Sequence, residues 1–274
     1  MGLLKRLLNF YIDSSIHVAL SVSALVIVTC YLYESVPTIY FISFVFLATV
    51  TGYNFVKYAA IAGLHHRRLT KSLKSIQVFS LLCFVLLLFF AFRLSFSTLL
   101  FSAAFALLTL FYAIPVFRNR NLRNFSGLKI FIVALVWAGV TVIVPLIDAG
   151  IEIENTHFLT FLQRFLFVIV LILPFDIRDV DYDSLALGTI VQKIGVLKTK
   201  ILGAVLMLIW FLLEFFKPEK NLEYLISFAF AGIILISFLF FAKRNQNKYY
   251  ASFWVEAVPI MWLAVYILAG HLLA

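Results

Sequence analysis

The sequence is poor in charged residues and in cysteine. Only 13 % of its 274 residues are charged, whereas 64 % are hydrophobic, and its two cysteines are Cys30 and Cys83. Both cysteines lie in apolar runs, which excludes a disulfide framework and a metal–thiolate centre. The sequence also lacks a glycine-rich phosphate loop, a nucleophile elbow and a Ser/His/Asp set. Any chemistry must therefore come from other residue types.

Long apolar runs are what the sequence has in abundance, and its mean hydropathy is +1.06. Runs of this length can cross about 30 Å of hydrocarbon as helices, and their continuity excludes a β-barrel. We predict an all-α polytopic membrane protein with nine transmembrane helices. The predicted spans are residues 14–34, 37–63, 72–92, 94–114, 125–147, 158–175, 197–216, 222–242 and 250–272. Residues 1–274 are predicted to form a single membrane domain, with an amphipathic interfacial helix over 1–13 and a nine-helix bundle over 14–272.

The positive charge is distributed unequally between the two sides of this predicted bundle. The formal net charge is +9. Of the 22 Lys and Arg residues, 17 fall on the side of the N-terminus, three fall on the opposite side, and Lys57 and Arg164 lie within spans. This bias predicts an N-in, C-out orientation in a lipid bilayer, and it explains the basic excess without a nucleic-acid partner. We expect an integral protein of a bacterial inner (cytoplasmic) membrane.

The acidic residues are few, but four of the 13 lie between residues 176 and 183, directly after an apolar run. At about 100° per residue, Asp176, Asp179 and Asp183 fall within about 60° of one helix face, whereas Asp181 points elsewhere. Three carboxylates on one stripe repel one another unless a cation lies between them. Their oxygen atoms suit Mg²⁺, which usually also holds a phosphate. The pattern predicts a magnesium–diphosphate site; the alternative is a solvated acidic loop that ends a helix.

Polar residues are concentrated in three long loops on the predicted inner side, residues 64–74, 115–129 and 176–200. Polar reactants need a wet compartment, so these loops predict an active mouth that faces the cytoplasm. The third loop continues the aspartate pattern with Gly188, Thr189 and Gly195. The second loop runs from Tyr112 through Pro115 and Arg118 to Lys129.

These segments together resemble the UbiA superfamily of intramembrane prenyltransferases. Residues 176–195 are similar to the second aspartate-rich motif of that family, and residues 112–129 look like its fourth-loop tyrosine–proline–basic segment. The resemblance implies nine N-in helices around a central cavity, with aspartate-rich motifs after the second and sixth helices. It also implies two Mg²⁺ ions, one per motif, that clamp the diphosphate of an isoprenoid donor.

The first motif of the family is largely missing. Asn54 is present, but Phe55, Tyr58 and Ala62 occupy the places where acids would be expected. We therefore favour one Mg²⁺ ion, held by Asp176, Asp179 and Asp183, over two. Basic residues would replace the other ion, because a cation neutralises a leaving diphosphate as a metal does. The residues expected to contact the diphosphate are Asn54, Lys57, Arg67, Arg68, Tyr112, Lys129 and Arg178.

The predicted function is transfer of an isoprenoid chain from a polyprenyl diphosphate to a small hydrophobic acceptor. The acceptor stays open among an aromatic quinone precursor, a porphyrin, a lipid phosphate and another small ring. The alternative function is that of a non-catalytic pseudo-enzyme that binds or transports lipids or isoprenoids on the same scaffold. Arg67, Arg68 and Lys71 also have an alternative role as topology determinants at an anionic leaflet.

Two further charged residues lie within predicted spans. Glu256 is an acid in the last span and Arg164 is a base in the sixth. Charges at such depth need a partner or a wet cavity. Pairing of Glu256 with Arg164 is the favoured interpretation, and Glu256 lining the acceptor cavity is the other.

Overall fold

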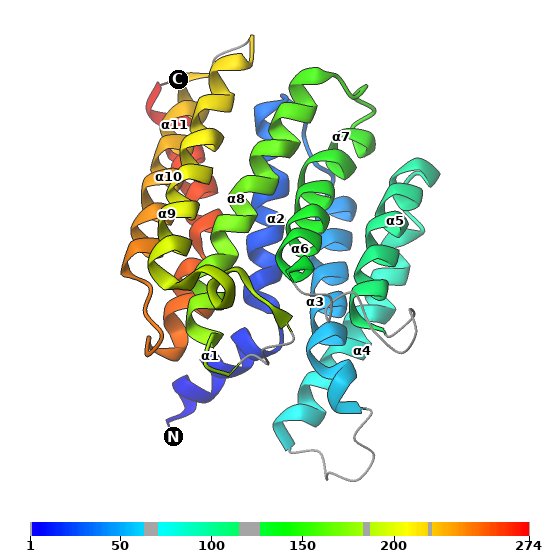
Figure 1. Ribbon diagram of the computed structural model, residues 1–274. Helices are drawn as coiled ribbons and strands as arrows, with labels where there is room; N and C mark the ends of the chain where they lie inside the picture. Colours follow the sequence, from blue (N-terminus) through cyan, green and yellow to red (C-terminus); the bar gives the residue numbers. More distant parts are fainter. Residues whose placement is uncertain (1, 63–70, 115–126, 183–186, 219–220, 274) are drawn as a thin grey trace.

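Helices form most of the chain that the structure describes. The computed structural model describes residues 2–62, 71–114, 127–182, 187–218 and 221–273, and no strand occurs among them (Figure 1). The α-helices are α1 (Leu3–Asp13), α2 (Ile16–Leu32), α3 (Ile39–Ala62), α4 (Lys71–Ala91), α5 (Phe96–Ala113), α6 (Leu128–Ala138), α7 (Val144–Asp148), α8 (Asn155–Asp179), α9 (Ile190–Leu213), α10 (Leu222–Phe241) and α11 (Val258–Leu273). Two π-helices, η2 (Gly139–Ile143) and η5 (Tyr250–Val255), and a 3-10 turn, η4 (Glu214–Phe216), complete the described elements. The predicted all-α class is confirmed.

Eight of the described helical segments are long and apolar enough to cross a membrane. A ninth is α2, which reaches that length only together with α1, from which it is bent by 55°. Most spans begin and end within a few residues of the prediction. The seventh begins earlier, at Ile190, because Thr189 caps the helix there, ahead of the apolar run. The count of eight to nine agrees with the predicted nine, and the N-in, C-out orientation stays a prediction.

Both π-helices lie shortly before a proline. Pro145 follows η2 at the start of α7, and Pro259 follows η5 at the start of α11. Proline has no N–H group to donate, so the regular α-helical ladder cannot continue through it, and a π turn is a wider turn that accommodates such a break. In η5 the N–H group of Glu256 donates to the carbonyl of Ala251, five residues back, at 3.1 Å. Glu256 therefore lies where the π pattern changes to the α pattern.

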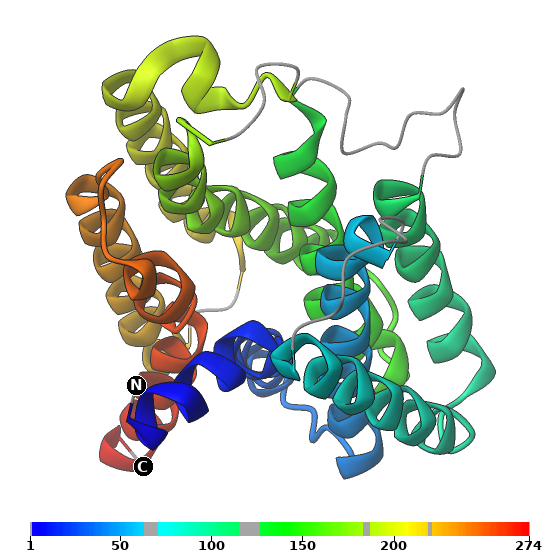
Figure 2. The same ribbon diagram turned by 90° about the horizontal axis from the view of Figure 1, so that it is seen from below.

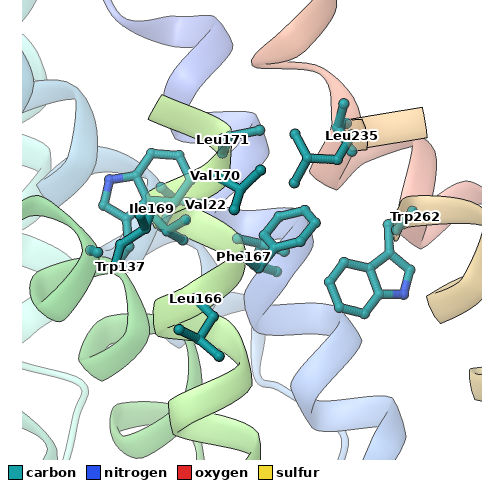
Figure 3. Packing of buried hydrophobic residues seen from close by; sticks show 14 of the residues in the cluster. Val22, Trp137, Leu166, Phe167, Ile169, Val170, Leu171, Leu235 and Trp262 are labelled. Carbon is teal, nitrogen blue, oxygen red and sulfur yellow. The ribbon is translucent and has the colours of Figure 1, made fainter. Parts of the chain in front are cut away.

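The core is built around α8. In the most apolar stretch of α8, 61 % is buried inside the protein, against 11 % in α4 and in α5. Helix α8 therefore lies inside the bundle, whereas α4 and α5 face its surroundings. Phe167 of α8 packs near Trp262 of α11 and Leu235 of α10, as Figure 3 shows. On the same side the rings of Trp210 and Phe228 stack with centroids 3.6 Å apart. Such side-chain packing associates helices in a membrane, where lipid tails offer an equally apolar environment.

The helices run side by side, and the two termini lie at opposite ends of the bundle (Figure 1). Seen from the end that carries the N-terminus, α4 and α5 lie on one side, and α9 and α10 lie on the other (Figure 2). An apolar pocket of about 500 Å³ lies between α2, α3, α4 and α11. Aliphatic and phenylalanine side chains with Ser23 and Ser43 line it, and none of the predicted site residues does.

Candidate active site

Asp176 lies one turn before the end of α8 and is only 2 % exposed. The Nζ atom of Lys129, at the start of α6, lies 3.0 Å from its Oδ1 atom. A buried carboxylate requires a charged or hydrogen-bonding partner, so this ion pair joins α6 to α8. The side chain of Gln246 donates a hydrogen bond to the carbonyl of Pro174 at 3.0 Å, which ties the loop before η5 to the same end of α8.

Asp179 ends α8 and is bound by its neighbour Arg178. The guanidinium donates from Nε to Oδ1 at 2.7 Å and from Nη2 to Oδ2 at 2.9 Å. This two-pronged geometry is the strongest that an arginine and a carboxylate form. Asp181 points away and pairs with Arg244 at 3.1 Å, where both side chains are more than half exposed. This placement agrees with the prediction that Asp181 stands apart from the stripe.

The magnesium prediction concerns Asp176, Asp179 and Asp183, and Asp183 lies outside the described residues. Within the part of the chain that the structure describes, no three His, Cys, Asp or Glu side chains form a group that could hold a metal ion. The two described carboxylates supply the hard oxygen atoms that suit Mg²⁺. Each of them already has a cation beside it, Lys129 or Arg178. The magnesium site therefore stays a prediction that needs Asp183 as its third ligand.

Asn54 and Lys57 lie on α3 and are bound to the junction between α1 and α2. The Asn54 amide donates to the carbonyl of Ser14 at 2.9 Å and to Oγ of Ser80 at 2.7 Å, and its oxygen accepts from Ser15 at 2.8 Å. Both amide hydrogens of this buried residue are thus used inside the protein. Lys57 donates from Nζ to Oγ of Ser15 at 2.9 Å, so Ser15 connects the two side chains.

One of the three positions where acids were expected on α3, Tyr58, has a structural contact instead, and the side chain of Ala62 lies outside the described residues. The hydroxyl of Tyr58 donates to the carbonyl of Asp13, the last residue of α1, at 3.0 Å. Phe55 is 41 % exposed. The end of α3 therefore contacts α1 through Tyr58, and the junction between α1 and α2 through Asn54 and Lys57. Arg67 and Arg68 lie outside the described residues.

Glu256 connects these helices electrostatically. Its carboxylate interacts with Lys57 of α3 and Arg178 of α8. We call the set Lys57, Lys129, Asp176, Arg178, Asp179 and Glu256 the charged cluster. The favoured pairing of Glu256 with Arg164 is wrong. Arg164 is buried, donates to Oγ1 of Thr29 at 3.2 Å and stacks on the ring of Trp262 at 5.0 Å.

Aromatic side chains lie beside the charged cluster. Tyr112, near the end of α5, is buried. Tyr53 of α3 interacts electrostatically with both Tyr112 and Glu256, and its hydroxyl accepts a hydrogen bond from Nε1 of Trp137 at 2.6 Å. The predicted contact of Tyr112 with a diphosphate stays a prediction.

The glycines and the threonine after the aspartates shape the backbone. Thr189 caps α9, accepting from the N–H group of Gln192 while its own N–H group donates to the Gln192 side chain. Gly188 and Gly195 have φ angles of +50° and +79°, which side-chain-bearing residues rarely adopt. The N–H group of Gly127 donates to the carbonyl of Leu187 at 3.0 Å. This turn and the start of α6 therefore lie together, next to the Lys129–Asp176 pair.

The arrangement of the helices is similar to that of a solved structure, that of digeranylgeranylglyceryl phosphate synthase. The alignment covers 97 % of this chain and 99 % of that chain, with a TM-score of 0.56 and 16 % sequence identity. That enzyme is a UbiA-family prenyltransferase. The chain has the UbiA fold. A UbiA homologue from Archaeoglobus fulgidus aligns over 96 % of this chain and 94 % of its own, at 11 % identity and a TM-score of 0.46. No family model and no curated protein matches the sequence.

Two of the predicted segments lie at the ends of long helices. The second span, α3, carries Lys57 near its end, and the sixth, α8, carries Asp176, Arg178 and Asp179 at its end. Lys57 and Arg178 both interact electrostatically with the Glu256 carboxylate. Sequence reasoning assigned Glu256 a different partner, although an acid inside an apolar span close to a proline was a signal for it.

Proposed function

We propose that the chain is a membrane prenyltransferase that moves an isoprenoid chain from a polyprenyl diphosphate to a small hydrophobic acceptor. The observation that carries the proposal is the charged cluster, in which Lys129 pairs with Asp176 and Arg178 binds Asp179. Lys57 and Arg178 of the same cluster both interact electrostatically with Glu256. Transfer of an allylic chain builds negative charge on the leaving diphosphate, and fixed cations at that point stabilise it.

Mg²⁺ would be held by Asp176, Asp179 and Asp183 and would supply further positive charge for the diphosphate. Lys129 and Arg178, which now neutralise the two described aspartates, would turn to phosphate oxygens when the ion enters. Arg178 suits this role because its planar fork matches phosphate as well as carboxylate. Asn54 keeps Ser15 in place for Lys57. The apolar helices would exclude water from the allylic cation.

The same pairing favours a second candidate, the non-catalytic isoprenoid-binding protein. Asp176 and Asp179 are both neutralised from within the chain, by Lys129 and Arg178. A site that keeps these two pairs has no charge left for a metal ion and would bind a lipid without ionising it.

The two candidates differ in the release of diphosphate. Purified protein would be incubated with radiolabelled geranylgeranyl diphosphate and Mg²⁺. We expect Asp179→Asn to slow diphosphate release about 100-fold, as loss of a charge-stabilising group does. Asp181→Asn is the matched control, because Asp181 is exposed and paired with Arg244 away from the cluster; its release rate should equal that of the wild type. Equal background release from wild type and Asp179→Asn would leave only the binding protein.

A further inference from the structure

The short helix α1 leaves part of an apolar stripe uncovered. Leu3, Leu4 and Leu7 are 73 %, 81 % and 57 % exposed in the part of the chain that the structure describes. Lys5 and Arg6 lie between them and are exposed as well, and no acid occurs in α1 before its last residue. At about 100° per residue, the three leucines share one arc of about 100°, and both cations fall outside it. An apolar stripe with basic residues beside it is typical of a helix that lies on a membrane surface.

The apolar side of α1 is covered by the bundle only toward its end. Ile12 is buried, and the ring of Phe10 packs edge-on against Phe79 of α4, with centroids 5.7 Å apart. The leucines at the start of the helix extend beyond these contacts. Burying apolar surface is favourable at about 25 cal/mol per Å², so the uncovered leucines favour contact with lipid chains.

Polar contacts fix the orientation of α1 on the bundle. The side-chain oxygen of Asn9 accepts a hydrogen bond from the Tyr249 hydroxyl at 2.8 Å. The carboxylate of Asp13 lies 3.6 Å from the ammonium group of Lys248, and its backbone carbonyl accepts from the Tyr58 hydroxyl at 3.0 Å. Held in this way from α3 and from the segment before η5, α1 cannot roll about its axis. Its exposed leucines and cations therefore form a preorganised surface.

The direction of α1 suits the level of the membrane surface. Helix α2 has 17 residues, a length of about 25 Å, which is close to the hydrocarbon thickness of about 30 Å. Helix α1 is bent from α2 by 55° (Figure 1). Ser15 at the bend has a φ angle of +65° and donates its hydroxyl to Asn54 at 2.8 Å. Helix α1 therefore runs obliquely across the end of the bundle, where headgroups meet lipid chains.

The charge of the exposed surface selects the kind of lipid that fits it. Among the described residues, no acid forms an ion pair with Lys5 or Arg6. A neutral lipid would cover the leucines and leave both cations without a counter-charge. An acidic phospholipid supplies both parts, because its chains cover apolar side chains while its negative headgroup attracts basic ones.

We propose that α1 is a docking surface for acidic phospholipids of the leaflet at this end of the bundle. The leucines enter the boundary between headgroups and chains, and Lys5 and Arg6 bind the phosphate groups. The surface is built from exposed side chains of one helix that the bundle holds in a fixed orientation.

Lipid titration of the full chain in detergent tests this docking. Gly2→Cys would carry a polarity-sensitive fluorophore beside the leucines, because an added Cβ there meets no atom within 4 Å and Cys30 and Cys83 are buried. Phosphatidylglycerol and phosphatidylcholine with the same oleoyl chains would be added separately, and a shift of the emission to shorter wavelengths reports lipid on α1. We expect phosphatidylglycerol to bind about 30-fold more tightly, because each basic residue near an anionic surface contributes about fivefold. Salt at about 1 M should remove most of this preference.

Variants of the same labelled protein show whether the two cations of α1 cause the preference. Lys5→Gln/Arg6→Gln should bind both lipids equally well. The matched control is Lys198→Gln/Lys243→Gln, which removes the same charge from exposed residues of α9 and of the segment after α10 and should keep the preference. Equal binding of the two lipids by the wild type would overturn the proposal. So would an unchanged preference in Lys5→Gln/Arg6→Gln, or an equal loss in both double variants, which would assign the effect to net charge alone.

Discussion

At the scale of residues, ion pairs hold several helix ends together. In the Lys129–Asp176 pair, the side chains are 22 % and 2 % exposed. Water therefore hydrates neither charge fully, and each charge needs the other. Asp176 was predicted from its helical stripe, because the spacing of 176 and 179 is a local property of one helix. Its partner was predicted only as a diphosphate contact, because the pairing joins residues 47 positions apart.

Replacing Lys129 by Met should lower the free energy of unfolding by about 3 kcal/mol, because it leaves the buried Asp176 carboxylate without its cation. The matched control is the double variant Lys129→Met/Asp176→Asn, which removes both charges and should recover part of the loss. Thermal unfolding of the purified variants in detergent measures both. Equal stability of the single and double variants would contradict a stabilising ion pair.

At the scale of elements, the apolar runs predicted the helices well and the irregular backbone poorly. Each span is a local, continuous signal of about 20 residues. The π-helices η2 and η5 carry no such signal beyond a following proline, and the early start of α9 at Ile190 lies in a polar stretch. Gly195 marks the same limit: its φ and ψ of +79° and 166° break α9 after its first turns.

Gly195→Ala should lower the free energy of unfolding by about 1–3 kcal/mol, because this backbone conformation is almost exclusive to glycine. No atom lies within 4 Å of the position of an added Cβ, so the loss would come from the backbone alone. The matched control is Gly52→Ala in the regular helix α3, where a Cβ also meets nothing and should stabilise by about 0.5–1 kcal/mol. Chemical denaturation in detergent compares the two. An equal gain for both would show that α9 does not need the kink.

At the scale of the whole molecule, the charge bias predicts which side of the membrane each loop faces. Cys30 and Cys83 are both buried, so the wild type gives a low background in labelling by a membrane-impermeant maleimide. Glu152→Cys, before α8, should react in intact cells, whereas Lys243→Cys, after α10, should react only after the membrane is permeabilised; both positions are exposed. Labelling in the opposite order would reverse the predicted N-in, C-out orientation.

The assembly of the charged cluster was the part that sequence could not supply. Lys57, Arg178 and Glu256 come from three spans far apart in the chain, and only the packing of the fold lets the first two interact electrostatically with the third. The pairing of Glu256 with Arg164 failed for the same reason. Both are charges in apolar spans, but Arg164 lies three turns before Asp176 on α8 and meets Thr29 and Trp262 there.

The short amino-terminal helix is anchored from two directions to the end of the bundle that carries the charged cluster. The backbone carbonyl of Asp13 accepts a hydrogen bond from the Tyr58 hydroxyl, and its carboxylate lies 3.6 Å from the ammonium group of Lys248. The side-chain oxygen of Asn9 accepts a hydrogen bond from the Tyr249 hydroxyl at 2.8 Å. Ser15, at the bend that follows, holds Lys57. Deleting the first fifteen residues would therefore remove the Ser15 hydroxyl to which the Lys57 ammonium group donates. Shortened versions of this protein are a poor choice for activity measurements.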